Sequence, residues 1–482
     1  MTEPAALDSL ARARPPDDIP AAALPLNPRD GLTPVAVNGE FGARGALVQG
    51  ALSRTLLKFA LPSVASMLLM TLFFTADAFW VGRYVGADGL AAVSTSIFWI
   101  WMIVSLADMI SVGLTAVASR RHGEGQPRLA ARAVGDAVLF AVLLGCVIAV
   151  LGHAWRGAMF AVMDTPASVT ALGKVYLGTY LLGTPLLFGF FAVDAGFRAS
   201  GDTRTPFLLL LSTVLVGLLL DPVLILGLGP APHLGIAGAA IATIFTRAIA
   251  FLIGVVILAR RRLIVMGRLT IAALRPIVRV GLPTAVTGVV FANIYVLLTR
   301  TTTHFGTPAL AALGVGHRVE SWTFMIGVGF GAAAAAVVGQ NLGARNPQRA
   351  ARAGWIACGY ASAVAAVGAS LEYLLAPQFA ALFTTDAAVI AESVHYLRIV
   401  AISTLFIGTE LVLEGALGGA GETLPPMITS TTLTALRLPL AAWAAPIWGT
   451  AGIWWAISLT ALGRGVAMAG LWKWGRWKRR VV

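Results

Sequence analysis

Long apolar runs separated by short polar segments set the pattern of this chain. About twelve runs recur along it, and each holds about 20 residues or more, enough to cross the hydrocarbon core of a bilayer as a helix. They lie near residues 56–82, 89–117, 130–153, 169–195, 205–228, 235–259, 276–299, 309–338, 350–375, 389–416, 426–447 and 450–472. The pattern predicts an all-α integral membrane protein with twelve transmembrane helices.

The segments that flank the runs occur twice, in the same order. Two copies of one helical unit are the sequence mark of a transporter built from two halves. Because each half holds an even number of spans, the halves insert in the same orientation, related by a pseudo-twofold axis along the membrane normal. The matching pairs are Gly123–Ala133 with Gly343–Ala353, Ala199–Pro206 with Gly419–Pro426, Gly235–Ala242 with Gly449–Ala456, and Leu61-Pro62 with Leu282-Pro283.

The repeat and the polar stretches also predict the domain organisation. The first stretch is rich in Ala and Pro and lacks an apolar segment, which is typical of a disordered tail, and no cleavable signal peptide is visible. The predicted parts are a disordered cytoplasmic tail at 1–53, a six-helix half at 54–259, a basic cytoplasmic linker at 260–275, a second six-helix half at 276–472, and a basic cytoplasmic tail at 473–482.

Charge decides the orientation and excludes one class of partner. The chain is 58% hydrophobic and only 12% charged, which excludes a soluble globular protein. Its net charge of +13 gathers in alternate loops, as the positive-inside rule requires, so we expect both termini in the cytoplasm and no binding to nucleic acid. The inside set is Arg120, Arg121, Arg128, Arg132, Arg198, Arg204, Arg260, Arg261, Arg262, Arg268, Arg275, Arg279, Arg345, Arg349, Arg352, Lys473, Arg476, Lys478, Arg479 and Arg480.

Ionisable side chains within membrane spans are costly and mark functional sites, and Asp77 is the clearest candidate. It lies among apolar residues in the first span, and helical spacing puts Phe73, Trp80 and Tyr84 on its face as candidate cavity aromatics. A carboxylate beside aromatic rings at low dielectric can take a proton or bind a cation. The alternative is an interfacial Asp that caps a helix or pairs with Arg83.

Further carboxylates lie in later spans. Asp221 precedes Pro222, whose ring frees a backbone carbonyl, so the two oxygens suit a small hard cation; alternatively Asp221 repairs the kink's hydrogen bonding. In the second half, Glu320 and Glu414 are candidates for the same role, with a structural network as the alternative. Glu410 shares a helix face with Glu414, so a proton or a cation held between the two is one option, and a structural role for Glu410 is the other and the favoured one. Carboxylates also at membrane depth are Asp108, Asp136 and Asp194, the last two near Arg132 and Arg198.

No constellation of residues indicates an enzyme. The chain lacks a Gly-rich phosphate loop, so no built-in ATPase drives transport, and it lacks metal-ligand spacings and a nucleophile elbow. Cys146 and Cys358 fall within predicted spans as small apolar residues. We therefore expect no cofactor and no resident metal, apart from Na⁺ at Asp77 and Asp221 as one option for the coupling ion.

Five motifs in order resemble the multidrug and toxic compound extrusion (MATE) family, over roughly residues 54–475 of this twelve-span repeat. They are Val81-Gly-Arg83 with Gly89-Leu-Ala-Ala-Val93, Gly201-Asp-Thr-Arg-Thr-Pro206, Leu220-Asp-Pro222, Gly235-Ile-Ala-Gly-Ala-Ala-Ile-Ala-Thr243, and Val338-Gly-Gln-Asn-Leu-Gly-Ala344. The resemblance implies a monomeric antiporter in the bacterial cytoplasmic (inner) membrane. It would export small organic, often cationic compounds in exchange for H⁺ or Na⁺.

By the same resemblance, Asp77 falls where bacterial relatives place a coupling carboxylate, and Asp221 and Thr243 fall where they line the same cavity. Gly217 departs from the pattern, because many relatives carry Asn there, one turn before the Asp. Asn293 replaces an acidic residue used by other branches. These departures favour coupling through the first half, and protons over sodium.

Two other functions stay open at this point. One is a flippase for lipid-linked oligosaccharide or polysaccharide precursors, from the same superfamily, which would need a large cationic cavity for pyrophosphate. Candidates for that charge are Arg247, Arg318 and Arg437. The other is a membrane enzyme or receptor, which would need a clustered catalytic set or a folded extramembrane domain. Neither is visible in the sequence.

Overall fold

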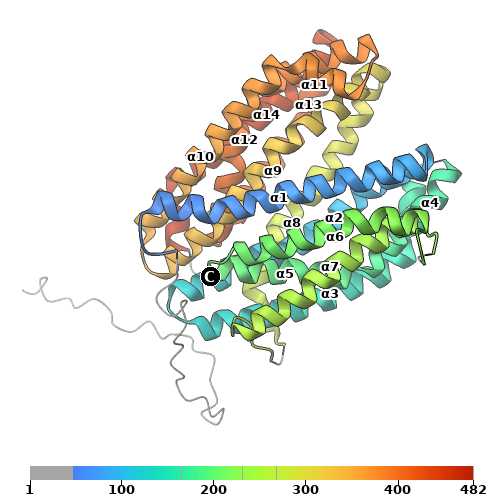
Figure 1. Ribbon diagram of the computed structural model, residues 1–482. Coiled ribbons are helices and arrows are strands. Elements are labelled where there is room, and N and C mark those ends of the chain that lie inside the picture. The colour runs from blue at the N-terminus through green and yellow to red at the C-terminus, as the bar shows by residue number, and fades with distance from the viewer. Residues whose placement is uncertain (1–46, 164–165, 231, 268, 481–482) are drawn as a thin grey trace, which may run out of the picture. The chain divides into compact units, whose positions relative to one another are not determined.

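The computed structural model describes residues 47–163, 166–230, 232–267 and 269–480, and the described chain is built from helices without strands. In the first half, α3, α5, α6 and α7 lie together (Figure 1). The helices of this half are α1 (Leu52–Tyr84), α2 (Ala87–Gly123), α3 (Pro127–Val162), α4 (Ala167–Leu182), α5 (Thr184–Ser200), α6 (Arg204–Leu226) and α7 (Ile236–Arg260).

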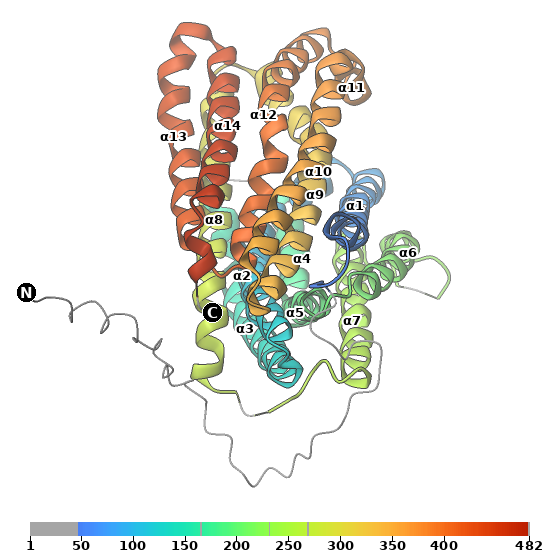
Figure 2. The same cartoon turned by 90° about the vertical axis from the view of Figure 1, so that its left-hand side faces the viewer.

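The second half repeats this order of helices. Figure 2 shows α10, α12, α13 and α14 side by side, and α12 packs on α9, α10 and α14. The helices are α8 (Ile271–Thr303), α9 (Thr307–Gly343), α10 (Pro347–Leu374), α11 (Ala376–Phe383), α12 (Ala387–Gly419), α13 (Leu424–Trp448) and α14 (Thr450–Trp474), with a short 3₁₀ helix at Arg476–Arg479.

Twelve long elements emerge within the described residues, as predicted. Nine helices are long and apolar enough to cross a membrane on their own. The predicted fourth span is broken at Gly183 into α4 and α5, which meet at 51° and together form a tenth. Pro185, in the first turn of α5, cannot donate the backbone bond that would continue the helix. The remaining two, α13 and α14, each span 25 residues, and each carries a buried arginine that lowers its mean hydropathy.

The same local contacts recur in both halves, which shows the repeat in three dimensions. Near Pro62 of α1, the hydroxyl of Thr203 donates to the carbonyl of Phe59 at 2.9 Å. Near Pro283 of α8, the hydroxyl of Thr423 donates to the carbonyl of Val280 at 2.6 Å. Each proline disturbs its turn, and a hydroxyl at the start of a later helix of the same half bonds a carbonyl in that turn. The matched prolines therefore serve matched helix contacts.

Small residues let the halves touch closely at the ends of α2 and α9. A Cβ atom at Gly123 would collide with the carbonyl oxygen of Gln340, and one at Gly343 would collide with that of Arg120. Further along, Gly113 approaches the backbone of α8 in the same way. Small residues at crossings bring helix backbones into direct contact, and this is how membrane helices associate. The halves are therefore held together at the ends of the helices that carry the predicted cytoplasmic arginines.

The Gln-Asn pair of the Val338–Ala344 motif ties three segments together at this same end. The Gln340 side chain donates to the carbonyl of Ala199 at 2.8 Å and accepts from the backbone N–H of Leu47 at 3.2 Å. Asn341 donates to the carbonyls of Leu47 and Val337. The motif is therefore a structural clamp between α9, the end of α5 and the segment before α1.

Three predicted boundaries can be placed against these elements. Most of the predicted tail at 1–53 lies outside the described residues, but its described end differs from the prediction, because Leu47 is buried and hydrogen-bonded. α8 begins at Ile271, capped by Thr270, so the connection between the halves ends earlier than residue 275. Beyond residue 473, Trp477 stacks on Trp472 with ring centroids 3.9 Å apart.

Candidate functional site

Asp77 and Asp221 come together inside the first half. Asp77 of α1 is 4% exposed and Asp221 of α6 is fully buried. Tyr176, on α4, lies beside Asp77, and the charges of the two carboxylates act on one another. One oxygen of Asp77 and both oxygens of Asp221 lack a hydrogen-bond partner among the described residues. Two buried carboxylates whose charges repel one another favour the uptake of a proton or a small cation.

These contacts decide between the alternatives for both residues. Asp77 forms no ion pair with Arg83 in the described chain, and it lies inside α1 rather than at a helix cap. Asp221 does not repair the hydrogen bonding at Pro222, since neither of its oxygens engages the described backbone. Buried carboxylates without an internal cation are unfavourable in a folded membrane protein unless they serve binding. The pair is therefore the leading candidate in the first half for binding H⁺ or a cation.

Gly217 makes room for Phe73, which explains the departure from the family pattern. A Cβ at Gly217 would lie 2.6 Å from the Phe73 ring and 3.3 Å from the Thr246 methyl group. Phe73 is buried, and the guanidinium of Arg247 lies 6.0 Å from its ring centroid and 5.3 Å from that of Phe190. An Asn side chain at residue 217 would occupy the volume that the ring fills. The sequence change thus replaces an amide ligand with an aromatic wall.

The other first-half candidates lie in different settings. Thr243 of α7 is buried, and its carbonyl accepts from the hydroxyl of Thr246 at 2.9 Å. Trp80 stacks on Tyr84 with centroids 5.6 Å apart, and Tyr84 is 49% exposed. The three predicted aromatics therefore do not share one surface, because Phe73 packs inside the half while Tyr84 faces outward.

Glu320 belongs to a buried polar cluster in the second half. Tyr396 faces its carboxylate, and the charges of Glu372 and Arg437 act on it. Arg437 donates to the hydroxyl of Thr460 at 3.1 Å and lies over the ring of Tyr295. One oxygen of Glu320 has no hydrogen-bond partner within the described chain. Glu320 therefore lies in a network with one arginine, unlike Asp77 and Asp221.

Glu410 and Glu414 share a helix face but lie in different settings. Glu410 is buried and pairs with Arg464 of α14 at 3.3 Å, so it is structural. Glu414, one turn later on α12, instead lines a cavity between the halves. The two other predicted pairs also form, Arg132 with Asp136 and Arg198 with Asp194.

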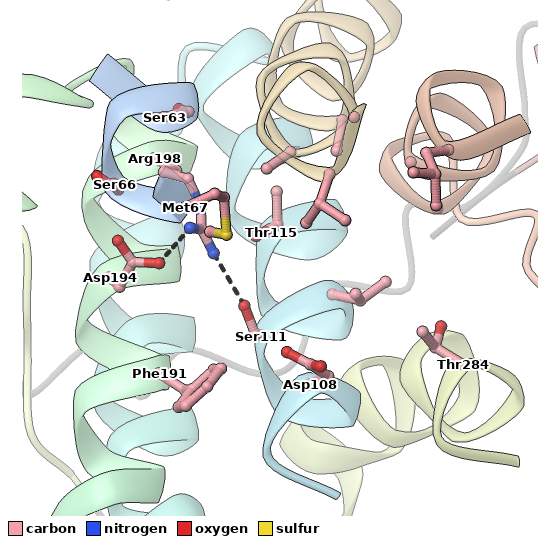
Figure 3. A pocket seen from close by; sticks show the side chains of 18 of the residues that line it. Ser63, Ser66, Met67, Asp108, Ser111, Thr115, Phe191, Asp194, Arg198 and Thr284 are labelled. Carbon is pink, nitrogen blue, oxygen red and sulfur yellow. Dashed lines mark hydrogen bonds and ion pairs between the residues drawn. The ribbon is translucent and has the colours of Figure 1, made fainter. Parts of the chain in front are cut away.

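A central cavity of about 270 Å³ lies where the two halves meet. Figure 3 shows Arg198 of α5 reaching across it, with its guanidinium paired to Asp194 and donating to the hydroxyl of Ser111 at 3.1 Å. Asp108 lies one turn before Ser111 on α2, facing the same space. The apolar part of the lining comes from Met67, Met70, Val112, Phe190, Phe191 and Leu411. The cavity combines several carboxylates with sulfur, aromatic and aliphatic surface.

The sequence analysis overlooked several of these residues, although the repeat offered a signal. Tyr176 and Tyr396 occupy equivalent positions, in Val175-Tyr-Leu177 and His395-Tyr-Leu397, and each faces a buried carboxylate. Asp194 and Glu414 are also equivalent, and both line the central cavity. Aligning the halves residue by residue would have found both pairs. Nothing in the sequence indicated that Asp108 shares a cavity with Glu414.

This fold and site define a multi-pass membrane transporter made of two homologous halves, and comparison with known proteins agrees. The MatE family model matches residues 62–223 and 283–443, one match in each half. The chain belongs to the MATE family, as its motifs predict.

Curated relatives and solved structures cover most of the chain. It is 27% identical to a FAD transporter of Shewanella oneidensis, over 88% of this chain and 95% of that protein. It is 28% identical to the probable multidrug resistance protein NorM of Thermotoga maritima, over 89% and 94%. A mutant of the Vibrio cholerae MATE transporter VcmN has a TM-score of 0.81 at 22% identity, over 89% and 98%. A MOP superfamily transporter from Pyrococcus furiosus has a TM-score of 0.80 at 23% identity, over 89% and 96%.

Proposed function

We propose that this transporter is a secondary antiporter that exports small organic, often cationic compounds in exchange for H⁺ or Na⁺. The observation that carries the proposal is the buried pair Asp77 and Asp221, which has no cationic partner in the described chain. A site of this kind binds a proton or cation on one side of the membrane and releases it on the other. The central cavity between the halves would hold the transported compound.

Protons fit the pair better than sodium. Na⁺ is held by several oxygen ligands, and the Gly217 departure removes an amide oxygen while Phe73 fills its place. No group of three His, Cys, Asp or Glu side chains suited to a metal ion occurs among the described residues. A carboxylate pair with one nearby tyrosine can accept a proton without further ligands.

Charge in the central cavity argues against an anionic cargo. Three carboxylates line it, from Asp108, Asp194 and Glu414, against the single guanidinium of Arg198. A flippase for pyrophosphate-linked sugars would need the opposite balance. None of the three arginines named for a flippase lines this cavity. Arg247 packs on Phe73 and Phe190, Arg318 lies over the ring of Phe383, and Arg437 donates to Thr460. FAD carries a pyrophosphate too, so the function named for the Shewanella relative fits this cavity less well than a cation does.

We further propose that the protein lies in a bacterial inner membrane as a monomer, with both termini in the cytoplasm. The arginine-rich connections support this orientation, because cytoplasmic loops carry an excess of Lys and Arg. In this orientation the halves touch at the cytoplasmic ends of α2 and α9.

Ethidium transport into inverted membrane vesicles, with the gradient switched between protons and sodium, tests the function. We expect transport that needs a proton gradient and falls to background in Asp77→Asn, since the amide cannot release a proton. Asp88→Asn, an exposed change at the start of α2, is the matched control. Transport that survives in Asp77→Asn would move the coupling site to Glu320 or Glu414. If the wild type transports no ethidium under either gradient, the proposal is refuted.

A further inference from the structure

The side chains that line the central cavity carry more negative than positive charge, and both halves contribute to the excess. Arg198 neutralises Asp194, its partner on the same helix. Asp108 of the first half and Glu414 of the second form no ion pair or hydrogen bond with other described residues. The charge of Arg464 acts on Glu414, but Arg464 is already paired with Glu410. The charge of Arg198 acts on Asp108 as well as on Asp194, so one guanidinium faces three carboxylates among the described lining residues, and the cavity keeps an excess of negative charge.

The pseudo-symmetry of the halves shows that this arrangement is asymmetric. Residues one repeat apart line the cavity together, such as Ser63 with Thr284 and Pro206 with Pro426. At two of these paired positions the first half supplies a charge and the second does not. Asp108 corresponds to Val328, and Arg198 corresponds to Gly418. Among the described lining residues, the second half supplies one charged side chain, Glu414. Asp108 and Glu414 therefore do not lie at repeat-equivalent positions.

A hydroxyl adds an independent sign that this cavity binds a polar ligand. Thr115 of α2 is 5% exposed and lines the cavity one turn beyond Ser111. No other described residue hydrogen-bonds its hydroxyl, whereas most buried hydroxyls in these helices bond a backbone carbonyl. The side chain of Thr115 is thus buried as a whole, while its hydroxyl lies on the cavity and is free to bond a group that enters it.

We propose that Asp108 and Glu414 bind two cationic groups of one compact aromatic or amphipathic dication, which thereby bridges the halves. The inference rests on the proposed export function and narrows its substrate class. An amidinium or guanidinium group meets a carboxylate through paired N–H donors, and the hydroxyl of Thr115 accepts from the same ligand. The rings of Phe190 and Phe191 and the thioether of Met67 cover the apolar body. The bridge breaks when the halves move apart, so binding and the conformational change are coupled.

The matched probes are benzene-1,4-dicarboxamidine and 4-carbamoylbenzamidine, which differ by one charge and little in shape. Binding of each to the purified full-length protein is measured by calorimetry. We expect the dication to bind about tenfold more tightly or better, the lower range for a close charge pair. Asp108→Asn and Glu414→Gln should each abolish this preference, and the double variant should lose no more than either alone. Asp88→Asn should keep it.

The measured quantity is the ratio of the affinities for the dication and the monocation. A variant that misfolds binds neither probe, so a changed ratio cannot be the result of misfolding. Equal binding of dication and monocation by the wild type would overturn the inference, as would a preference that survives both substitutions. The proposed export function would stand in those cases if gradient-driven ethidium transport persists. Absence of binding of either probe, together with absence of ethidium transport, would overturn both.

Discussion

At the scale of single residues, the chain places uncompensated carboxylates where a soluble protein would bury apolar groups. Asp77 and Asp221 are both within the apolar interior of the first half, and no cationic side chain of the described chain forms an ion pair with either. In the second half, by contrast, the buried carboxylate of Glu410 is neutralised by an ion pair with Arg464. This contrast makes the pair in the first half the stronger candidate for ion coupling.

Gly217 and Phe73 form a steric pair that mutagenesis can separate. Gly217→Asn should lower the free energy of unfolding by about 1–3 kcal/mol, as expected when a well-packed core is overfilled. Adding Phe73→Ala should recover most of the loss, because it restores the volume. Thermal unfolding of the two single variants and the double variant gives the coupling energy. Strictly additive effects would show that the ring and residue 217 do not compete for space.

At the scale of helices, the crossing of α2 and α9 depends on backbone contact. Gly123 and Gly343 face the carbonyls of Gln340 and Arg120, and neither carbonyl can move as a flexible side chain would. The kink contacts of Thr203 and Thr423 fix the first helix of each half in the same way. We therefore expect these helices to move as units, with the α2–α9 crossing as the contact that forms and breaks during transport.

Gly343→Ala should push α2 and α9 apart at their crossing and weaken the contact between the halves there. Gly314→Ala, in the same helix, should leave this contact and transport unchanged. A Cβ at Gly314 meets no atom within 4 Å, whereas one at Gly343 meets backbone. We expect slower ethidium transport and greater labelling of a cysteine placed near the crossing for the first variant alone. Identical behaviour of the two variants would mean that the crossing does not limit transport.

At the scale of the whole molecule, orientation follows from charge. The connection between α7 and α8 carries arginines, and the connection between α8 and α9 carries few charges. In a background without Cys146 and Cys358, Arg260→Cys should react with an impermeant maleimide only in inverted vesicles. His304→Cys should react only in right-side-out vesicles. Both positions are exposed. The opposite labelling pattern would reverse the proposed topology.

The sequence predicted most of the fold because the bilayer makes hydrophobic length decisive. Twelve runs, their repeat and their family could be read directly, since each span must bury about 20 apolar residues and satisfy its own backbone. Differences arose where backbone continuity, rather than hydropathy, sets the boundary. The break at Gly183 inside one apolar run and the docking of Leu47 before the first helix are examples.

For the candidate site, too, the sequence predicted some features and contacts between helices decided the others. Asp77, Asp221 and Glu414 could be chosen by sequence alone, because a carboxylate inside an apolar run is conspicuous and costly. Their surroundings could not be predicted, because Tyr176 lies beside Asp77 from α4, and Arg464 of α14 pairs with Glu410 rather than with Glu414. Whether a buried charge is neutralised depends on contacts between helices, which hydropathy does not encode. The sequence therefore determined which charges enter the membrane, and only the tertiary structure decided which of them stay unpaired and face the central cavity.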